Sequence, residues 1–227
     1  MSMIQEYDLF LLDFDGLLVN TEQLHREAYN QMCKRRGFYL TWDFQRYCKA
    51  AHFESTGLRD QIYAEFPDLY KMEPDWTVLY QEKKDAYMKL LNEGAVKLMP
   101  GAEEFLLALQ DAGRKRCVVT HSPLEQIENI RKQNPLLDSI PVWFTRENYS
   151  KPKPDPECYE IAIKEMANEN DRIIGFEDSP RGLSALKATQ AKAILVTDIR
   201  YDNMESILEG NTALYDKLSD FLINHVA

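Results

Sequence analysis

Short apolar runs alternate with longer amphipathic segments along most of this chain. The segments between the runs have apolar residues at helical spacing, as in Phe105, Leu106 and Leu109 ahead of Gly113. Strands that alternate with helices predict a parallel sheet with helices on both faces, an α/β fold. The runs have the length of buried strands, and they are Leu9–Leu12, Cys117–Val119, Val142–Phe144, Ile173–Phe176 and Ile194–Val196.

Residues 18–93 have a different pattern, with helical periodicity and without a strand-like run. Apolar residues recur at helical spacing, as in Leu24, Ala28 and Met32, and aromatic residues are dense. We expect these aromatics, which include Trp42, Phe44, Tyr47 and Phe53, to form a local core. The pattern predicts an inserted α-helical domain at 18–93 and an α/β core formed by 1–17 and 94–227.

Three proline-containing sequences predict where helices begin. Ser122-Pro123-Leu124-Glu125 has the form of a capping box with proline in the first helical position. Asp155-Pro156 and Ser179-Pro180 also place a capping side chain ahead of proline. Each sequence marks the passage from the carboxyl end of a strand into a helix, which is the edge of an open α/β sheet where ligands bind.

Charge and composition argue against several classes of partner. The 227 residues carry a formal net charge of −10, so no net positive field attracts a nucleic acid or an anionic membrane. The N-terminal sequence lacks the features of a signal peptide, and the apolar stretches are too short to span a membrane. The 4 dispersed cysteines are typical of a reducing compartment. We expect a soluble cytoplasmic protein.

Acidic residues follow two of the predicted strands. In Asp13-Phe14-Asp15-Gly16, continued strand alternation would point Asp13 and Asp15 the same way. Two such carboxylates about 4 Å apart repel by about 4 kcal/mol at an effective dielectric of about 20, and a divalent cation would remove that cost. Glu177 and Asp178 follow a later run, and carboxylates of this kind suit Mg²⁺. A solvated turn is the other interpretation of these acidic sequences.

Two further polar clusters are suited to an anion. Thr120-His121-Ser122 precedes a predicted helix, where a hydroxyl and free amides bind phosphate. Lys151, beside rigid prolines, would offer its ammonium with little freedom. Singly, these are an ordinary helix cap and an ordinary surface lysine. All four clusters at strand ends, in this order, favour phosphate chemistry.

Through DFDG, Thr120, Lys151 within KPKPDP, and GFEDSPRG, the chain resembles the haloacid dehalogenase superfamily. The resemblance covers nearly the whole chain and is specific to the β-phosphoglucomutase-like group, which implies a Rossmann-like core with a helical cap inserted after the first motif. It implies that Asp13 is the nucleophile that forms an aspartyl-phosphate. Asp15 would protonate the leaving oxygen and later activate water. Dehalogenating members lack an acid there, so Asp15 indicates phosphoryl transfer.

The resemblance also implies how phosphate and metal are held. Thr120 and the amide of His121 would bind phosphoryl oxygens, and Lys151 would offset their charge. The expected activity is Mg²⁺-dependent hydrolysis of a small phosphomonoester, such as a sugar phosphate, by a monomer. The Mg²⁺ ligands would be Asp13, the backbone carbonyl of Asp15, Asp178 and, more loosely, Glu177.

Other functions stay open at this point. A sugar-phosphate mutase of the β-phosphoglucomutase type shares the motifs, but the glycine, serine and arginine of mutase cap loops have no clear match in 49–59. Asn20 replaces the usual aspartate, and His121 stands where a small residue is commoner. A non-catalytic protein that binds a phosphorylated metabolite is disfavoured by the intact Asp13 and Asp15. Phosphonate cleavage would need a cap lysine in a context that the sequence does not provide.

His25 lies four residues after Thr21, which places both on one face of a helix that begins there. It is either a surface histidine of the first cap helix or, as in the mutases that the chain resembles, a substrate-side residue that couples the cap to the acid/base.

Overall fold

We describe a computed structural model of the chain, in which residues 3–54, 56–94, 96–210 and 212–225 are placed. The chain forms two compact units, one made of Met1–Asn20 and Val96–Ala227 and the other of Thr21–Ala95. These limits lie a few residues from the predicted boundaries. The two segments that join the units run side by side, because Val19 forms an antiparallel bridge with Leu98 and the Asn20 amide donates to the Lys97 carbonyl at 2.9 Å.

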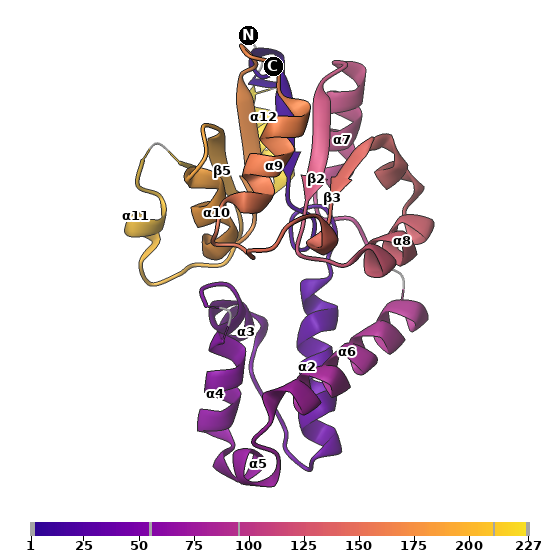
Figure 1. Cartoon of the computed structure of the whole chain (residues 1–227), viewed down its shortest axis with the longest axis vertical. Helices are drawn as coiled ribbons and strands as arrows, with labels where there is room; N and C mark the ends of the chain where they lie inside the picture. Colours follow the sequence, from indigo (N-terminus) through magenta and orange to yellow (C-terminus); the bar gives the residue numbers. More distant parts are fainter. Residues whose placement is uncertain (1–2, 55, 95, 211, 226–227) are drawn as a thin grey trace. The chain divides into compact units, whose positions relative to one another are not determined.

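The first unit contains a six-stranded parallel sheet in the order β3-β2-β1-β4-β5-β6 (Figure 1). The order reverses direction at β1, which lies between β2 and β4, and such a switch point is where ligands bind in open α/β sheets. The predicted parallel sheet is confirmed, with one addition: β6 is short and only half-buried, so it gives no apolar run. The strands are β1 (Leu9–Leu12), β2 (Lys115–Val119), β3 (Val142–Phe144), β4 (Ile173–Glu177), β5 (Lys192–Val196) and β6 (Ala213–Tyr215).

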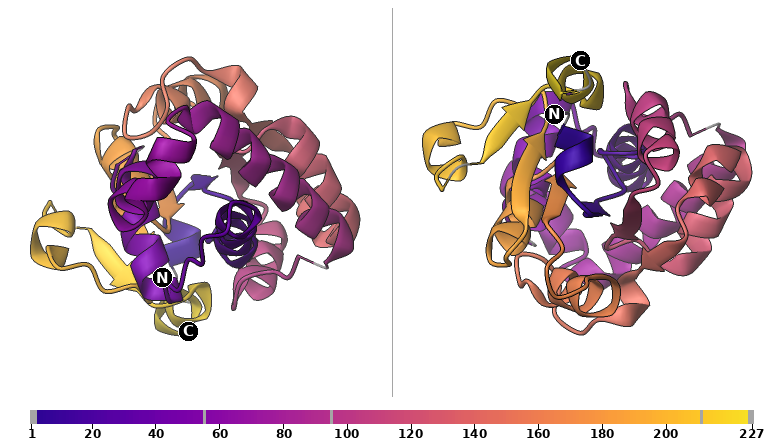
Figure 2. Two further views of the ribbon diagram at one scale, coloured as in Figure 1. Left: turned by 90° about the horizontal axis from the view of Figure 1, so that it is seen from below. Right: turned by 90° about the horizontal axis from the view of Figure 1, so that it is seen from above.

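Helices cover both faces of this sheet (Figure 2). Leu9 and Leu11 of β1 are buried in one cluster with residues of α9 (Glu157–Met166) and α10 (Pro180–Lys187). Phe10 points the other way and contacts Phe105 of α7 (Ala102–Asp111), with 6.3 Å between ring centroids. Phe105 in turn contacts Phe221 of α12 (Leu218–His225) at 5.7 Å. Because successive strand side chains alternate between faces, a strand covered on both sides is apolar throughout.

The remaining elements of this unit are short, apart from α8 (Leu124–Gln133), which follows β2. They are the helices α1 (Met3–Glu6) and α11 (Met204–Ile207) and the 3₁₀ turns η1 (Pro135–Ser139) and η2 (Arg146–Asn148).

The predicted helix starts have different outcomes. Helix α10 begins as predicted, because the Ser179 hydroxyl accepts the Gly182 amide at 3.2 Å and Pro180 follows. The α9 start has Asp155 Oδ1 accepting the Glu157 amide at 3.0 Å. The capping box predicted at Ser122 is wrong, because the residue before α8 is Pro123, which makes no side-chain cap hydrogen bond. The Ser122 hydroxyl is used elsewhere, as described below.

The second unit is helical in its described part, as the sequence predicts. Leu79, Ala86 and Leu91 of α6 are buried, and α6 packs along α2. Among the aromatics, Trp42 and Tyr47 are buried as expected, but Phe53 is 37% exposed and does not belong to a core. The helices are α2 (Glu22–Arg35), α3 (Phe44–Ala51), α4 (Gly57–Glu65), α5 (Pro67–Met72) and α6 (Trp76–Glu93). None of the helices described in either unit is both long and apolar enough to cross a membrane.

Candidate active site

Three buried carboxylates meet at the carboxyl ends of β1 and β4. Asp13 follows β1, Glu177 is the last residue of β4, and Asp178 comes next. One oxygen of each carboxylate lies within 4.8 Å of the other two. The structure therefore brings together three of the acids that the sequence identified as metal ligands.

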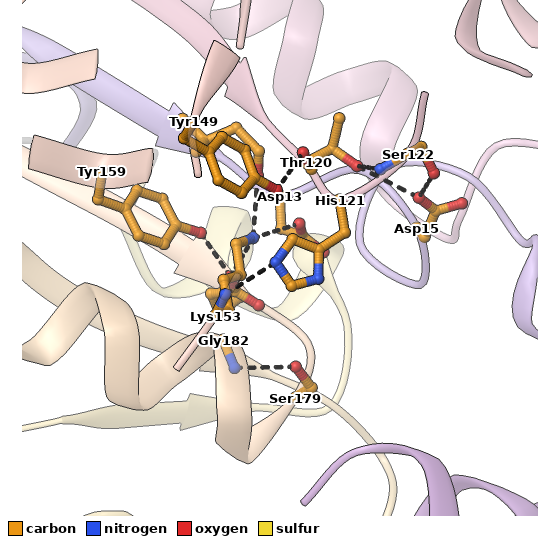
Figure 3. A network of polar contacts seen from close by, with 12 residues as sticks. Asp13, Asp15, Thr120, His121, Ser122, Tyr149, Lys153, Tyr159, Ser179 and Gly182 are labelled. Atoms are coloured by element: carbon orange, nitrogen blue, oxygen red, sulfur yellow. Dashed lines mark hydrogen bonds and ion pairs between the residues drawn. The ribbon is translucent and has the colours of Figure 1, made fainter. Parts of the chain in front are cut away.

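Lys153 is the cation that the structure places against this cluster (Figure 3). Its ammonium donates to Asp13 Oδ1 and Glu177 Oε1, both at 2.7 Å, and to the Val119 carbonyl at 2.9 Å. These three acceptors use all the donors of the ammonium. Burial alone would lower the pKa of Lys153, but Asp13 and Glu177 outweigh it and raise that pKa well above its usual value.

Lys151, which the sequence put forward for this place, lies elsewhere, and that prediction is corrected. Its side chain is 70% exposed and its ammonium is 3.6 Å from Asp155 Oδ2, on its own loop. In KPKP both lysines precede a proline, so the motif can be read in two registers that differ by two residues. The fold selects the second register, in which Lys153 reaches Asp13.

The surroundings of Asp13 oppose its ionisation. Burial, and then the neighbouring Glu177, raise the pKa of Asp13 from 3.8 to about 8, against the opposing effect of Lys153. The ammonium of Lys153 therefore does not fully compensate the negative charge that Asp13 carries when it is ionised. A hard divalent cation that prefers oxygen ligands, such as Mg²⁺, fits the donor set of Asp13, Glu177 and Asp178.

Two glycines leave room for the acids. Gly16 has φ +78°, and a Cβ there would lie 2.2 Å from Asp178 Oδ2. A Cβ on Gly182 would lie 2.1 Å from Glu177 Oε2. Any side chain at either position would displace a carboxylate, since real Cβ atoms do not approach oxygen so closely. The glycines that end DFDG and SPRG are thus part of the site.

Tyr159 supports the cluster from α9, a contribution that sequence reasoning missed. Its hydroxyl donates to Glu177 Oε1 at 2.5 Å, and its ring lies 4.9 Å from the Lys153 ammonium. Burial, and then Glu177, raise the pKa of Tyr159 well above its usual value, so the hydroxyl stays a donor. Tyr159 fits the apolar periodicity of its helix, and that periodicity does not predict that its hydroxyl contacts Glu177.

Asp15 occupies a separate position, turned toward the loop after β2 (Figure 3). Asp15 Oδ2 accepts the hydroxyls of Ser122 at 2.5 Å and Thr120 at 3.3 Å. Thr120 Oγ1 also accepts the Ser122 amide at 3.0 Å. Strand β1 ends at Leu12, so the strand alternation that would point Asp13 and Asp15 the same way does not continue. Asp13 contacts Lys153, whereas Asp15 contacts Ser122 and Thr120. Ser122 was predicted as a helix cap within a cluster suited to an anion, and its contact with Asp15 was not predicted.

His121 fixes the backbone next to the buried lysine. Its Nε2 accepts the amide of Lys153 at 2.8 Å, which leaves the ring proton on Nδ1. Burial, with the positive charge of Lys153, lowers the pKa of His121 to about 3, so the ring is neutral at physiological pH. The larger residue at this position therefore has a structural partner of its own.

His25 belongs to a polar cluster inside the second unit. Its Nδ1 is 2.7 Å from the ammonium of the buried Lys83, and its ring stacks on Tyr87 with centroids 4.0 Å apart. Burial and the Lys83 charge lower the pKa of His25 to about 3. In the same unit, His52 Nε2 lies 3.7 Å from Glu22 Oε2. His25 is thus half-buried in this cluster and is not an exposed surface histidine.

Most of this chain is similar in sequence or in structure to known proteins. The family model of the haloacid dehalogenase-like hydrolases matches residues 10–196. Protein CbbY of Cereibacter sphaeroides is 27% identical over 194 residues, which cover 83% of each chain. A phosphorylated carbohydrates phosphatase of Thermotoga maritima is 27% identical over 214 residues, covering 93% of this chain and 95% of the relative. The solved structure of a putative β-phosphoglucomutase from Thermotoga maritima superposes with a TM-score of 0.72 at 23% identity, covering 96% and 97%.

Proposed function

The chain belongs to the haloacid dehalogenase-like hydrolase family, and on that basis we propose that it is a Mg²⁺-dependent phosphatase of small phosphomonoesters that works through an aspartyl-phosphate. One observation carries the proposal: Asp13 lies at the carboxyl end of the central strand, 2.7 Å from a buried lysine and beside two further carboxylates. One point of the structure therefore offers a carboxylate that can act as the nucleophile, carboxylates that can bind a divalent cation, and an ammonium that can offset the charge of a phosphate.

The proposed reaction has two steps that balance as a hydrolysis. In the first, an Asp13 carboxylate oxygen bonds to phosphorus, the ester P–O bond breaks, and the proton of Asp15 passes to the leaving oxygen to form the alcohol. In the second, water attacks phosphorus, Asp15 takes the proton of that water, and the bond between phosphorus and the Asp13 oxygen breaks. Asp13 and the proton on Asp15 are then restored, and inorganic phosphate is released.

The other residues hold the phosphoryl group and its charge. Lys153, already an ion-pair partner of Asp13, would offset the negative charge of the phosphoryl oxygens, and the Thr120 hydroxyl and the His121 amide would donate to them. When bound by Asp13, Asp178, the Asp15 carbonyl and, more loosely, Glu177, Mg²⁺ would supply further positive charge at the phosphoryl group. The closeness of the Asp13, Glu177 and Asp178 carboxylates, whose oxygens lie within 4.8 Å of one another, supports this assignment.

The substrate class that we propose is a phosphorylated sugar or a similar metabolite. The relative from Thermotoga maritima is a phosphatase of phosphorylated carbohydrates, and it matches 93% of this chain. We also propose that the protein acts as a monomer. The 4 cysteines are free and buried, which supports a reducing compartment such as the cytoplasm.

A phosphate-release screen tests the proposal. Purified protein is incubated with phosphorylated sugars, glycerol phosphates and p-nitrophenyl phosphate, with Mg²⁺ and with EDTA. We expect release that requires Mg²⁺ and disappears in Asp13→Asn, while Lys151→Gln serves as a matched control that keeps activity. Release that persists in Asp13→Asn, or that survives complete removal of divalent cations, would overturn the mechanism.

The mutase is the second candidate, since the fold matches the structure of a putative β-phosphoglucomutase. Its test uses β-glucose 1-phosphate with a catalytic amount of a glucose bisphosphate. We expect phosphate release without accumulation of glucose 6-phosphate. Accumulation of the 6-phosphate that outpaces phosphate release would replace the phosphatase with the mutase.

A further inference from the structure

Gln126 of α8 makes polar contacts with the residues that hold Asp15. Its side chain is buried, with 6% exposure, and its amide nitrogen donates to Ser122 Oγ at 2.9 Å. The same nitrogen lies 3.5 Å from Asp15 Oδ1. We propose that Gln126 is a positioning residue that, through Ser122, holds the Asp15 carboxylate for proton transfer in the phosphatase proposed above.

The direction of the hydrogen bonds gives this arrangement its effect. A serine hydroxyl has one proton to donate and accepts with its lone pairs. Because Gln126 donates to Ser122, the hydroxyl proton of Ser122 points to Asp15 Oδ2. The amide orientation of Gln126 is fixed in turn, since its oxygen in that place would face the Asp15 carboxylate. The three side chains therefore form a directed chain of hydrogen bonds that ends on Asp15.

Neither residue is required here by the local structure. Ser122 precedes a proline and a helix, where its hydroxyl would cap the helix, yet the N-cap position of α8 is Pro123 and the Ser122 hydroxyl donates to Asp15. Gln126 occupies a buried position of α8 next to the buried Ile127, where an apolar residue would avoid the cost of burying an amide. Both polar groups are directed instead toward one carboxylate, 107 residues before Ser122 and 111 before Gln126.

The consequence is a dependence on the leaving group. An alkyl phosphate needs a proton from Asp15 as its P–O bond breaks, whereas p-nitrophenolate leaves without one. The value of kcat/KM covers only the steps up to departure of the leaving group, so the later attack of water does not enter it. A loss of Asp15 positioning therefore lowers kcat/KM for an alkyl phosphate and spares p-nitrophenyl phosphate.

The experiment compares Gln126→Met, which keeps the length of the side chain, with the unmodified enzyme on both substrates. The alkyl substrate is glucose 6-phosphate or, if the unmodified enzyme does not hydrolyse it, the sugar or glycerol phosphate that it hydrolyses fastest. We expect kcat/KM for the alkyl substrate to fall about 10- to 100-fold and that for p-nitrophenyl phosphate to change less than about 3-fold. Inhibition by inorganic phosphate should not change. Glu128→Gln, at an exposed position of the same helix, should leave both substrates unaffected.

Two further variants keep the test decisive. Gln126→Glu can only accept, so it would draw the Ser122 proton away from Asp15, and it should show the same split between substrates. If Gln126→Met does not fold, as judged by circular dichroism, Ser122→Ala provides the comparison. An equal loss on both substrates, or no loss on the alkyl phosphate, would overturn the role of Gln126. Failure of the phosphatase itself would appear separately, as phosphate release that survives Asp13→Asn or is absent with every substrate.

Discussion

The ammonium of Lys153 and the carboxylate of Asp13 are joined by a 2.7 Å hydrogen bond between buried groups, 140 residues apart in the sequence. The contact attaches the loop after β3 to the carboxyl end of β1. It also opposes the effects of burial and of Glu177 on the pKa of the candidate nucleophile, although it does not outweigh them.

The two lysines of KPKP should therefore differ sharply in effect. Lys153→Gln removes the ammonium from Asp13 and Glu177, and we expect phosphate release to fall by about 10²-fold or more. The same change should destabilise the protein, since it leaves buried carboxylates without their partner. Lys151→Gln should stay within about twofold of the unmodified enzyme, because that side chain is exposed. Initial rates and melting curves of both variants check this, and similar losses at both positions would contradict it.

Asp13→Asn should stabilise the protein in the absence of divalent cations. The pKa of Asp13 is raised from 3.8 to about 8, so its contribution to folding is fully present below pH 3.8 and is lost progressively as the pH rises from there to about 8. The variant removes that loss, and we expect an increase of about 0.5–2 kcal/mol in the free energy of unfolding, larger at pH 8 than at pH 5. Urea unfolding in EDTA at both pH values measures it. An unchanged or lower stability at pH 8 would contradict the account.

Binding of Mg²⁺ should release a proton. At pH 7 Asp13 is largely protonated without a cation, because its pKa is about 8, and a carboxylate must be deprotonated to ligate metal. We expect calorimetric titration with MgCl₂ in buffers of different ionisation enthalpy to show proton release at pH 7 that disappears above pH 9. The affinity should weaken by about tenfold per pH unit as the pH falls below that pKa. An affinity that is independent of pH would rule this out.

His121 should not titrate between pH 5 and 8. Burial and the charge of Lys153 lower its pKa from 6.5 to about 3, so the ring stays neutral over that range. Its contribution to stability is lost only as the pH falls below about 6.5 toward 3, because the unfolded chain takes up the proton first. Imidazole carbon–proton NMR shifts, assigned with His121→Gln, measure this directly. A titration midpoint near 6.5 would show that the bond to the Lys153 amide is absent.

Tyr159→Phe should cost about 1.5–3 kcal/mol of unfolding free energy, because it deletes a buried hydrogen bond to a charged carboxylate while it keeps the ring over Lys153. Tyr39→Phe is the matched control. That side chain is 67% exposed, and its change should stay within about 0.5 kcal/mol. Equal effects of the two substitutions would show that the Tyr159 hydroxyl contributes nothing to the cluster.

The acids of the site can be predicted from the sequence because each follows an apolar run that becomes a buried strand. Asp13 and Asp178 needed only that pattern. The lysine could not be assigned, since KPKP has two equivalent readings and the contact that separates them spans 140 residues. Ser122 was assigned to the local role of a cap because the competing partner, Asp15, is distant in sequence. Gln126 is a polar residue in a helix, and that alone does not predict its contacts with Ser122 and Asp15.

The two paired segments that join the units have a consequence for the evolution of this chain. The amide of Met99 donates to the carbonyl of Leu18, and that of Asn20 donates to the carbonyl of Lys97, both at 2.9 Å. The chain therefore leaves the α/β unit and returns to it at neighbouring points of a short ladder, and the path of the core does not depend on how much lies between them. Doubling the length of a flexible insert costs only about 0.6 kcal/mol of closure entropy. We therefore expect that changes in the length of the helical insert would leave the pairing of these two segments, and the sheet that carries Asp13, in place.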